Sequence, residues 1–410
     1  MKKVALSGAL AALIAIPALG IEVYNNEEKG ASVNIYGSLR GFVGGSGYLG
    51  NSYLSNIGSS NYQQTSNTGR FLIGFQNNSH FGIDTKYGKL TTKVEFGLHE
   101  TGFLSAGKGP GLRKVYGTYD FGSGGKLTFG KLDTPTIEGG FQTNFANNDA
   151  GGNGFGSITT GSRKLQVQYE HSGAKVAIIA DEPAEEGGNA TTTSYAQSYA
   201  KNSSLSTFPR IALSYESKLG DKGKLKAAIT YKYYDTDKQH ATDTKDVHAG
   251  HLLVGAKFGV GGDSTLSTFF HYGINGHLYK EQQTSQNLGM YAYNLNGNGY
   301  SDTIDAGLWA QRAGLLVEFG TKLNDTLSLA AGAGYQATFN GKNQRGAGAN
   351  GGLQSIHGYQ VYANLPINVA KGFQVVPQLA FYDTIQTYKG AEDAEHRSAL
   401  VGLVRLKYDF

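Results

Sequence analysis

The chain contains no cysteine, and beyond its N-terminus it has no apolar run long enough for a membrane-spanning helix. The absence of cysteine excludes disulfide frameworks, thiolate metal sites and cysteine nucleophiles, and it suits a protein that crosses an oxidising compartment unfolded. The formal net charge of +4 is too small to indicate nucleic acid as a partner.

Glycine and aromatic residues are abundant instead. The 410 residues include 60 glycines, 26 tyrosines and 20 phenylalanines. A glycine-rich, aromatic and polar chain without long apolar runs is not typical of a helical protein. All-β barrels often exceed 200 residues as single domains, so the length does not require several domains.

The first 20 residues, MKKVALSGALAALIAIPALG, have the three regions of a secretory signal peptide. We expect cleavage after Gly20, which leaves residues 21–410 as one exported domain. The alternative is a membrane anchor, but the apolar stretch from Val4 to Ile16 falls short of the ~20 residues that a spanning helix needs. No cysteine follows the leader, which excludes a lipoprotein.

Segments of alternating apolar and polar residues recur along the rest of the chain, as strands require. In KLTTKVEFGL (89–98), for example, Val94 and Phe96 alternate with Lys93 and Glu95. The connections between the segments are short and long by turns. Seven short, glycine-rich connections lie at 87–89, 121–126, 171–175, 219–224, 260–264, 323–326 and 369–372, and eight long ones lie near 45–68, 101–110, 132–161, 182–206, 236–246, 276–305, 339–352 and 386–395.

Fifteen connections join sixteen strands, and strict alternation puts both chain ends at the short-turn end. A β-sandwich also alternates, but it rarely carries sixteen strands in a hairpin meander. Apolar residues outward, polar residues inward and an even strand count are typical of an antiparallel transmembrane β-barrel with short periplasmic turns and long extracellular loops. The sequence therefore predicts an all-β, sixteen-stranded barrel in a bacterial outer membrane.

The last strand, VGLVRLKYDF, supports closure of this barrel. Its apolar face ends on Tyr408 and Phe410, and an edge left unpaired in lipid would cost several kcal/mol for each orphaned backbone group. We expect the first barrel strand, VNIYGSLRGF (33–42), to pair with it, and the two aromatic residues to join a girdle at the membrane interface. Pro377 is a misfit, because a proline within a strand cannot donate to the ladder and requires a bulge or a different register.

Three stretches and the C-terminus resemble a known family. They are SHFGIDTKYGKLTTKVEFGL (79–98), VYGTYDFGSGGKLTFGKLDTP (115–135), SRKLQVQYEHSGAKV (162–176) and the final KYDF. Together they resemble the bacterial general porins, which are trimeric, sixteen-stranded outer-membrane channels. The resemblance implies a homotrimer in contact with outer-membrane lipids and lipopolysaccharide, with no cofactor. It also implies that Tyr408 and Phe410 form the signal that the barrel-insertion machinery reads.

In these porins the third loop folds inward and places acidic residues opposite basic residues of the wall. Carried over by position, the loop is 132–161, with Asp133, Glu138 and Asp149 as its acids. The resemblance implies that they face bases of the wall at the pore constriction. The corresponding bases are Arg40, His80, Lys93 and Lys131, and His80 departs from the arginine that the family often has.

With the apolar face outward, basic residues outnumber acidic ones on the predicted inner wall. A like-charged lumen concentrates counter-ions, so we expect passive diffusion of ions and small hydrophilic solutes with a weak preference for anions. The inward set is Arg40, Lys93, Glu95, Lys164, Gln166, Arg210, Lys226, Lys232, Lys257, Arg312, Glu318, Arg405 and Lys407.

Two other functions share this architecture. A porin specific for phosphate or dicarboxylates would need an ordered ladder of bases, and a structural or adhesive barrel would need long, sticky loops. Enzymes are disfavoured, because no G-x-S-x-G nucleophile elbow is present. His248 and His251 are expected on opposite faces of one strand, which argues against a shared metal ion.

Overall fold

The computed structural model describes residues 20–52, 69–76, 78–98, 111–137, 139–145, 155–158, 163–180, 208–234, 247–279, 311–339, 353–388 and 395–410. The proposed signal peptide up to residue 19 lies outside the described residues.

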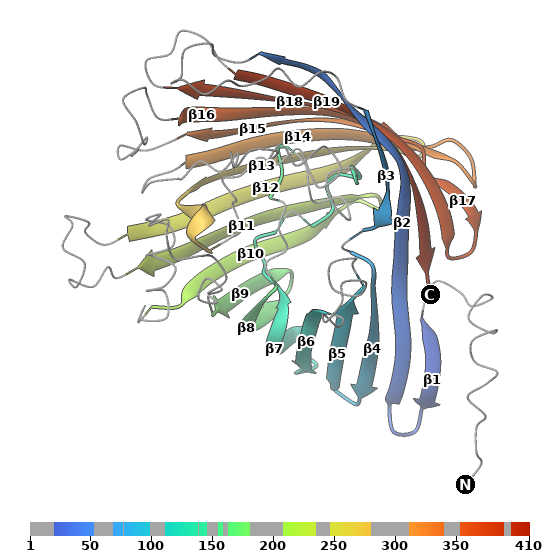
Figure 1. The fold of residues 1–410 in the computed structure, drawn as a ribbon. Helices are drawn as coiled ribbons and strands as arrows, with labels where there is room; N and C mark the ends of the chain where they lie inside the picture. Colours follow the sequence, from blue (N-terminus) through green and yellow to red (C-terminus); the bar gives the residue numbers. More distant parts are fainter. Residues whose placement is uncertain are drawn as a thin grey trace.

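One antiparallel sheet contains all the strands (Figure 1). They are β1 (Ile21–Asn26), β2 (Ala31–Ser52), β3 (Gly69–Phe75), β4 (His80–Tyr87), β5 (Leu90–Gly97), β6 (Gly111–Asp120), β7 (Gly125–Asp133), β8 (Arg163–His171), β9 (Ala174–Ile179), β10 (Arg210–Leu219), β11 (Gly223–Tyr234), β12 (Val247–Gly261), β13 (Ser264–Ile274), β14 (Gln311–Lys322), β15 (Ser328–Phe339), β16 (Leu353–Asn364), β17 (Ile367–Ala370), β18 (Phe373–Tyr388) and β19 (Glu395–Asp409). A short 3-10 helix, η3 (Gly276–Tyr279), follows β13.

The pairing pattern closes this sheet into a barrel of sixteen strands. Among the described residues, successive barrel strands pair with one another, β9 pairs with β10, and β19 pairs with β2, which closes the ring. Two barrel strands are interrupted: β3 and β4 both pair with β2, and β16 and β17 both pair with β18. Strand β1 pairs with β2 as an addition to the ring. The predicted strand number is therefore confirmed, while β1 and the extension of β2 to Ser52 were not foreseen.

Short and long connections alternate as the sequence predicts. The seven predicted short turns all join neighbouring strands of the barrel, for example β4 to β5 and β8 to β9. We call the end of the barrel that carries them the short-turn end. At this end a hydrogen bond from Lys222 reaches Asp263 at 2.7 Å and lowers the pKa of that carboxyl.

The strands separate apolar from polar side chains. Strand β9 is an exception that is apolar on both faces, since Ile178 is 52% exposed while Ala177 and Ile179 on the inner face are fully buried. On β11, Ile229 and Tyr231 are exposed while Thr230 and Lys232 are buried. Residues directly opposite each other on paired strands share a face. The register therefore assigns residues of the other strands to the inner or the outer face. It confirms that every residue of the predicted inward set lies on the inner face.

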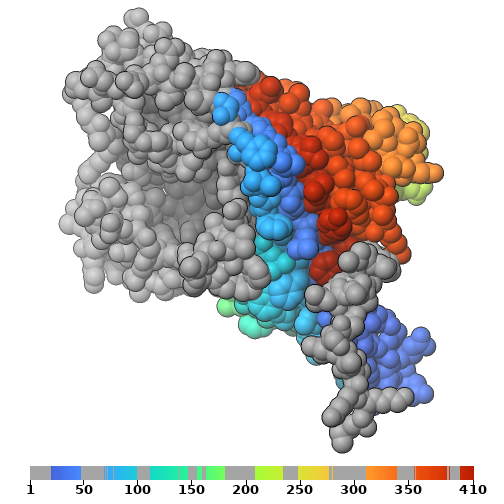
Figure 2. All heavy atoms as spheres, turned by 45° about the vertical axis from the view of Figure 1, so that its right-hand side comes forward, coloured from blue at the N-terminus to red at the C-terminus, as the bar shows by residue number. Residues whose placement is uncertain are grey.

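The first and last barrel strands lie side by side, as Figure 2 shows for blue β2 and red β19. Phe410 continues the ladder, since its backbone exchanges hydrogen bonds of 2.8 and 3.0 Å with Gly37. Its ring covers Gly37 so closely that an added Cβ would lie 2.3 Å from a ring carbon. On the same face, Tyr408 stacks on Phe373 with ring centroids 4.4 Å apart. The predicted pairing of the chain ends is therefore confirmed.

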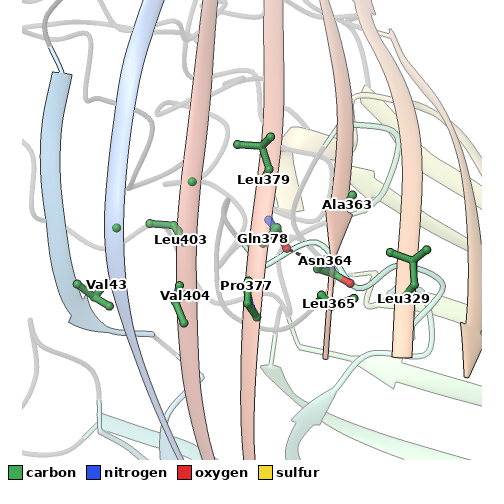
Figure 3. A pocket seen from close by; sticks show the side chains of 12 residues that line it. Val43, Leu329, Ala363, Asn364, Leu365, Pro377, Gln378, Leu379, Leu403 and Val404 are labelled. Carbon is green, nitrogen blue, oxygen red and sulfur yellow. Dashed lines mark hydrogen bonds between the residues drawn. The ribbon is translucent and has the colours of Figure 1, made fainter. Parts of the chain in front are cut away.

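Pro377 is accommodated by a break in the neighbouring strand. Strand β18 continues through Pro377, but its partner is interrupted between Asn364, which pairs with Gln378, and Ile367, which pairs with Val375. Leu365 donates a backbone hydrogen bond of 2.9 Å to the Pro377 carbonyl. A mostly apolar hollow of about 410 Å³ lies at this point, and Figure 3 shows side chains that line it, including Pro377, Leu365 and Leu379. The irregularity expected at Pro377 therefore takes the form of a gap in the strand that faces it.

Candidate functional site

Described residues between β7 and β8 contact inward-facing residues of the barrel wall. We call these residues, 134–137, 139–145 and 155–158, the inner segment. Its side chains and backbone contact inward-facing residues of β11, β12, β13, β14, β16, β18 and β19. The inner segment therefore touches both the middle and the final strands of the ring.

The first contacts are with β11 to β13. The carbonyl oxygen of Thr136 accepts a hydrogen bond from Nε2 of the buried His251 at 3.2 Å, while Tyr279 of η3 bonds the other ring nitrogen at 2.7 Å. Lys224 donates a hydrogen bond to the carbonyl of Gly139. These bonds fix the start of the inner segment and orient the histidine ring.

Glu318 on β14 holds the middle of the inner segment. Its Oε2 accepts hydrogen bonds from the backbone N–H of Thr143 at 2.6 Å, from the Thr143 hydroxyl at 2.7 Å and from the Tyr362 hydroxyl at 2.5 Å. Asn364 adds a bond to the Thr143 carbonyl at 3.1 Å. Hydrogen bonds to a carboxylate are about twice as strong as neutral ones, so Glu318 is the strongest single anchor.

Amide side chains hold the next two residues. Asn144 donates to the Tyr382 hydroxyl at 2.9 Å and accepts from Gln378 at 2.7 Å. Gln378 also accepts the backbone N–H of Phe145 at 3.0 Å, and Gln76, between β3 and β4, donates to the Phe145 carbonyl at 3.2 Å. These bonds satisfy backbone groups that would otherwise be buried without partners.

Glycines on the wall let the inner segment approach closely. A Cβ added to Gly334 would lie 1.9 Å from the carbonyl oxygen of Phe155, and one added to Gly314 would lie 3.0 Å from Cα of Gly156. A Cβ on Gly255 would fall 2.6 Å from the Phe141 ring. A larger residue at Gly334 or Gly255 would push the inner segment away from the wall, whereas one at Gly314 would first meet the ring of His271 at 2.3 Å.

Apolar side chains complete the contact and were not predicted. Phe141 and Ile158 pack with Leu253, Phe269 and Leu316 on β12 to β14. A second apolar cluster surrounds Phe145 and Phe155 and includes Phe42, Tyr362, Val376, Tyr382, Val401 and Leu403. The sequence does carry a signal for this contact in the wall strands, because ALVGLV (399–404) and LLV (252–254) are apolar on both faces.

Carboxylates and bases alternate on the wall formed by β2 to β8. Glu95 accepts hydrogen bonds from Arg113 at 2.8 Å and from the Tyr36 hydroxyl at 3.1 Å, and His80 lies 3.8 Å away. Lys93 pairs with Asp84 at 3.2 Å. Arg113 and Lys93 therefore have carboxylate partners within the wall itself.

The predicted basic residues differ in their placement. Arg40, His80 and Lys93 lie on the inner face of neighbouring strands, where Arg40 bonds Ser38 at 2.9 Å. The register instead places Lys131 opposite Val115 and Leu165, both of which are exposed. Lys131 therefore lies on the outward face, because residues paired directly share a face.

Of the three predicted acids, only Asp133 lies within the described residues. Asp133 forms ion pairs with Lys114 at 2.6 Å and Arg163 at 3.4 Å, a different set from the expected Arg40, Lys93 and Lys131. Glu138 and Asp149 lie outside the described residues. The sequence predicts Glu318 only as a charge of the inner wall and does not reveal that it anchors the inner segment.

No group of three or more His, Cys, Asp or Glu side chains suited to a metal ion occurs among the residues that the structure describes. His248 and His251 lie on opposite faces, since His248 is exposed and bonds Tyr231 while His251 is buried. Within the same described ranges, no helix is long and apolar enough to cross a membrane.

Solved structures share this architecture although the sequences have diverged. The outer membrane channel DcaP of Acinetobacter baumannii is 15% identical, with a TM-score of 0.61 over 95% of this chain and all of that one. A trimer form of OmpT from Vibrio cholerae is 15% identical, with a TM-score of 0.51 over 93% of this chain and all of that one. An anion-selective porin from Comamonas acidovorans is 12% identical, with a TM-score of 0.52 over 93% of this chain and all of that one.

The fold is that of the outer-membrane porins. No protein-family model and no curated protein matches the chain. At these identities the similarity concerns the porin fold and not individual site residues, whose roles must be argued from this chain's own contacts.

Proposed function

We propose that this chain is an outer-membrane porin through which ions and small hydrophilic solutes diffuse passively. The observation that carries the proposal is the separation of faces in a closed ring of sixteen strands. The outer face is apolar, as lipid contact requires, whereas the inner face carries lysine, arginine and glutamine side chains. Barrels of sixteen to eighteen strands leave an aqueous channel, unlike the filled interior of about eight strands.

The inner segment is proposed to narrow this channel. It corresponds in position to the third long connection, and its hydrogen bonds with Glu318, Gln378 and Gln76 hold it on the inner face. The charged residues proposed to act there are Asp133 and Glu318 together with Arg40, His80 and Lys93. Glu138 and Asp149 stay candidates by position alone.

A weak preference for anions is proposed from the charges of the inner wall. Asp84, Glu95 and Asp133 of this wall are each bonded to a neighbouring base, as Glu95 is to Arg113. The wall of β10 to β14 carries further bases, including Arg210, Lys226, Lys232 and Arg312. A confined lumen with an excess of bases concentrates anions and favours their flux.

Topology and assembly follow the same proposal. The short-turn end would face the periplasm and the long connections the outside, after removal of a signal peptide that ends at Gly20. A homotrimer is proposed because the similar OmpT was solved in a trimer form. The C-terminal Tyr408 and Phe410 are proposed as the signal for barrel insertion. No catalytic residues, cofactor or nucleic acid partner are proposed.

Reconstitution into a planar lipid bilayer tests this function. The purified, folded protein should insert in discrete conductance steps in potassium chloride, and a salt gradient should give a reversal potential of the sign expected for anions. A folded protein that inserts without any conductance would favour a structural barrel instead. A reversal potential of the opposite sign would refute the anion preference alone.

A further inference from the structure

The outer face of the barrel has a hollow where the strand that faces Pro377 is interrupted. We call this space of about 410 Å³ the outer hollow. Side chains that line it follow one another from strand to strand in Figure 3, in the order Val43, Val404, Pro377, Leu365 and Leu329. The register pairs Pro377 with Val404, and Val404 with Val43. These three residues share the outward face with Leu379, which lies two positions along β18 and is 56% exposed.

Two rows of residues bracket the outer hollow along the strands. Toward the short-turn end Tyr408 stacks on Phe373, and toward the other end Tyr359 pairs with Asp383 on the outward face. Ten positions of β18 separate Phe373 from Asp383, which corresponds to ~34 Å of strand at ~3.4 Å per residue. At a strand tilt of about 45° this length spans ~24 Å of height, close to the ~25 Å of an apolar band. The outer hollow therefore lies within the hydrocarbon layer.

The outer hollow is long and narrow. Its lining extends from Val43 on β2, across β19, β18 and β16, to Leu329 on β15, and these five strands are neighbours in the ring. Four spacings of about 4.8 Å give a length of about 19 Å. A volume of about 410 Å³ over this length leaves a mean width of roughly 5 Å, enough for one hydrocarbon chain whose carbon atoms contact the wall at about 3.5–4.0 Å. This shape fits a long, unbranched apolar group.

Small residues of the wall leave this space open. Gly402 and Ala363 are among the lining residues. A Cβ added to Gly402 would have Cδ1 of Leu379, at 3.8 Å, as its nearest atom. An unfilled gap loses dispersion contacts for the atoms that line it, so an apolar group that enters from the hydrocarbon layer gains these contacts.

We propose that the outer hollow binds one acyl chain of a membrane phospholipid in an extended conformation. At ~30 Å³ for a group the size of water, its volume holds about fourteen methylene groups, the length of a common membrane acyl chain. Its end at Leu329 closely follows the short turn at 323–326. The chain therefore enters from the leaflet at the short-turn end, whose acyl chains reach ~15 Å into a hydrocarbon core of ~30 Å. This binding depends on the outer face alone and is independent of which solutes pass through the lumen.

Lipid retention in native mass spectrometry tests the proposal. The folded native protein in a mild detergent is titrated with dimyristoyl- or dioctanoyl-phosphatidylethanolamine, and the fraction of chains that carry one lipid is measured. The dimyristoyl lipid should reach half-saturation at about a tenfold lower concentration, because its longer chain makes more contacts in the outer hollow. In Gly402→Leu the half-saturating concentration of this lipid should rise about tenfold, since four carbon atoms of the new side chain take the place of part of the acyl chain.

Gly47→Leu is the matched control. Gly47 lies opposite Leu400 on the outward face of β2, outside the outer hollow. No atom of the described residues lies within 4 Å of a Cβ added there, so this variant should bind lipid as the native protein does.

Equal half-saturation in the native protein and Gly402→Leu, or equal loss in both leucine variants, overturns the proposal. A native protein that retains no lipid, or that binds both lipids equally, overturns it without any variant. A changed oligomeric state of Gly402→Leu with unchanged lipid retention would identify a contact between subunits instead. Conductance is not measured here, so none of these results decides whether the barrel is a channel.

Discussion

Replacing Gly334 with alanine should displace the inner segment toward the middle of the channel. Gly334 lies on the inner face of β15, and an added Cβ would be 1.9 Å from the carbonyl oxygen of Phe155 and 2.9 Å from Nε2 of Gln360. Non-bonded carbon and oxygen atoms rarely approach within about 3 Å, so Phe155 must retreat by about 1 Å or more. The wall strand behind it is fixed by pairing on both sides, so the inner segment is the part that moves.

The displacement also weakens the docking. The hydrogen bond of 3.1 Å from the Phe155 N–H to Gln360 would lengthen, and the Phe155 ring would shift from Tyr382, 6.1 Å away between centroids. Overpacking of this kind costs about 1–3 kcal/mol. We expect a lower single-channel conductance with more current noise, because the inner segment can move only toward the lumen.

Gly320→Ala on β14 is the matched control, since its added Cβ would meet no atom closer than 3.4 Å. The assay is single-channel recording in a planar bilayer, with thermal unfolding in detergent followed in parallel. Conductance and noise equal to those of the native protein in Gly334→Ala would refute the proposed docking of Phe155 against the wall.

Three further substitutions test other contacts. Glu318→Ala removes the acceptor of three hydrogen bonds and should destabilise the docked inner segment by about 2–3 kcal/mol, seen as faster proteolysis within residues 134–158; cleavage at the native rate would argue against Glu318 as the anchor. Glu95→Gln removes a negative charge of the inner wall and should shift the reversal potential toward anions, whereas Arg113→Gln should shift it toward cations, and equal permeability in both would show that this cluster does not face the ion path. Gly37→Ala places a Cβ 2.3 Å from the Phe410 ring and should reduce the fraction of folded barrel in the membrane, while Gly41→Ala, whose nearest atom is 3.8 Å away, should not; equal folding of the two would contradict the proposed role of Phe410 in closure.

The alternation of side chains was sufficient to predict the barrel. Period-two patterns such as Lys93, Val94, Glu95 and Phe96 identify the inner and outer faces of a strand without knowledge of its neighbours. The turn-rich connections then give the number of strands. The pairing of the last strand with the first follows from the need to leave no edge in lipid.

The candidate site could be predicted only in part, because it depends on contacts between distant segments. Glu318 and Thr143 are 175 positions apart, and no local pattern relates them. Lys131 was assigned from similarity to a motif, whereas its side depends on the register with Val115 and Leu165. Strand β1 adds to the ring without changing the alternation, so the count of turns did not reveal it.

Chemical access from water to the two faces of one strand tests the central claim most directly. The native chain has no cysteine, so single cysteines at Lys93, on the inner face, and at Val94, on the outer face, are the only thiols in their variants. During bilayer recording, a membrane-impermeant thiol reagent should reduce the conductance of the Lys93→Cys channel stepwise and leave the Val94→Cys channel unchanged. A current unaffected in Lys93→Cys, or equal modification of both variants, would contradict a water-filled lumen enclosed by the polar face.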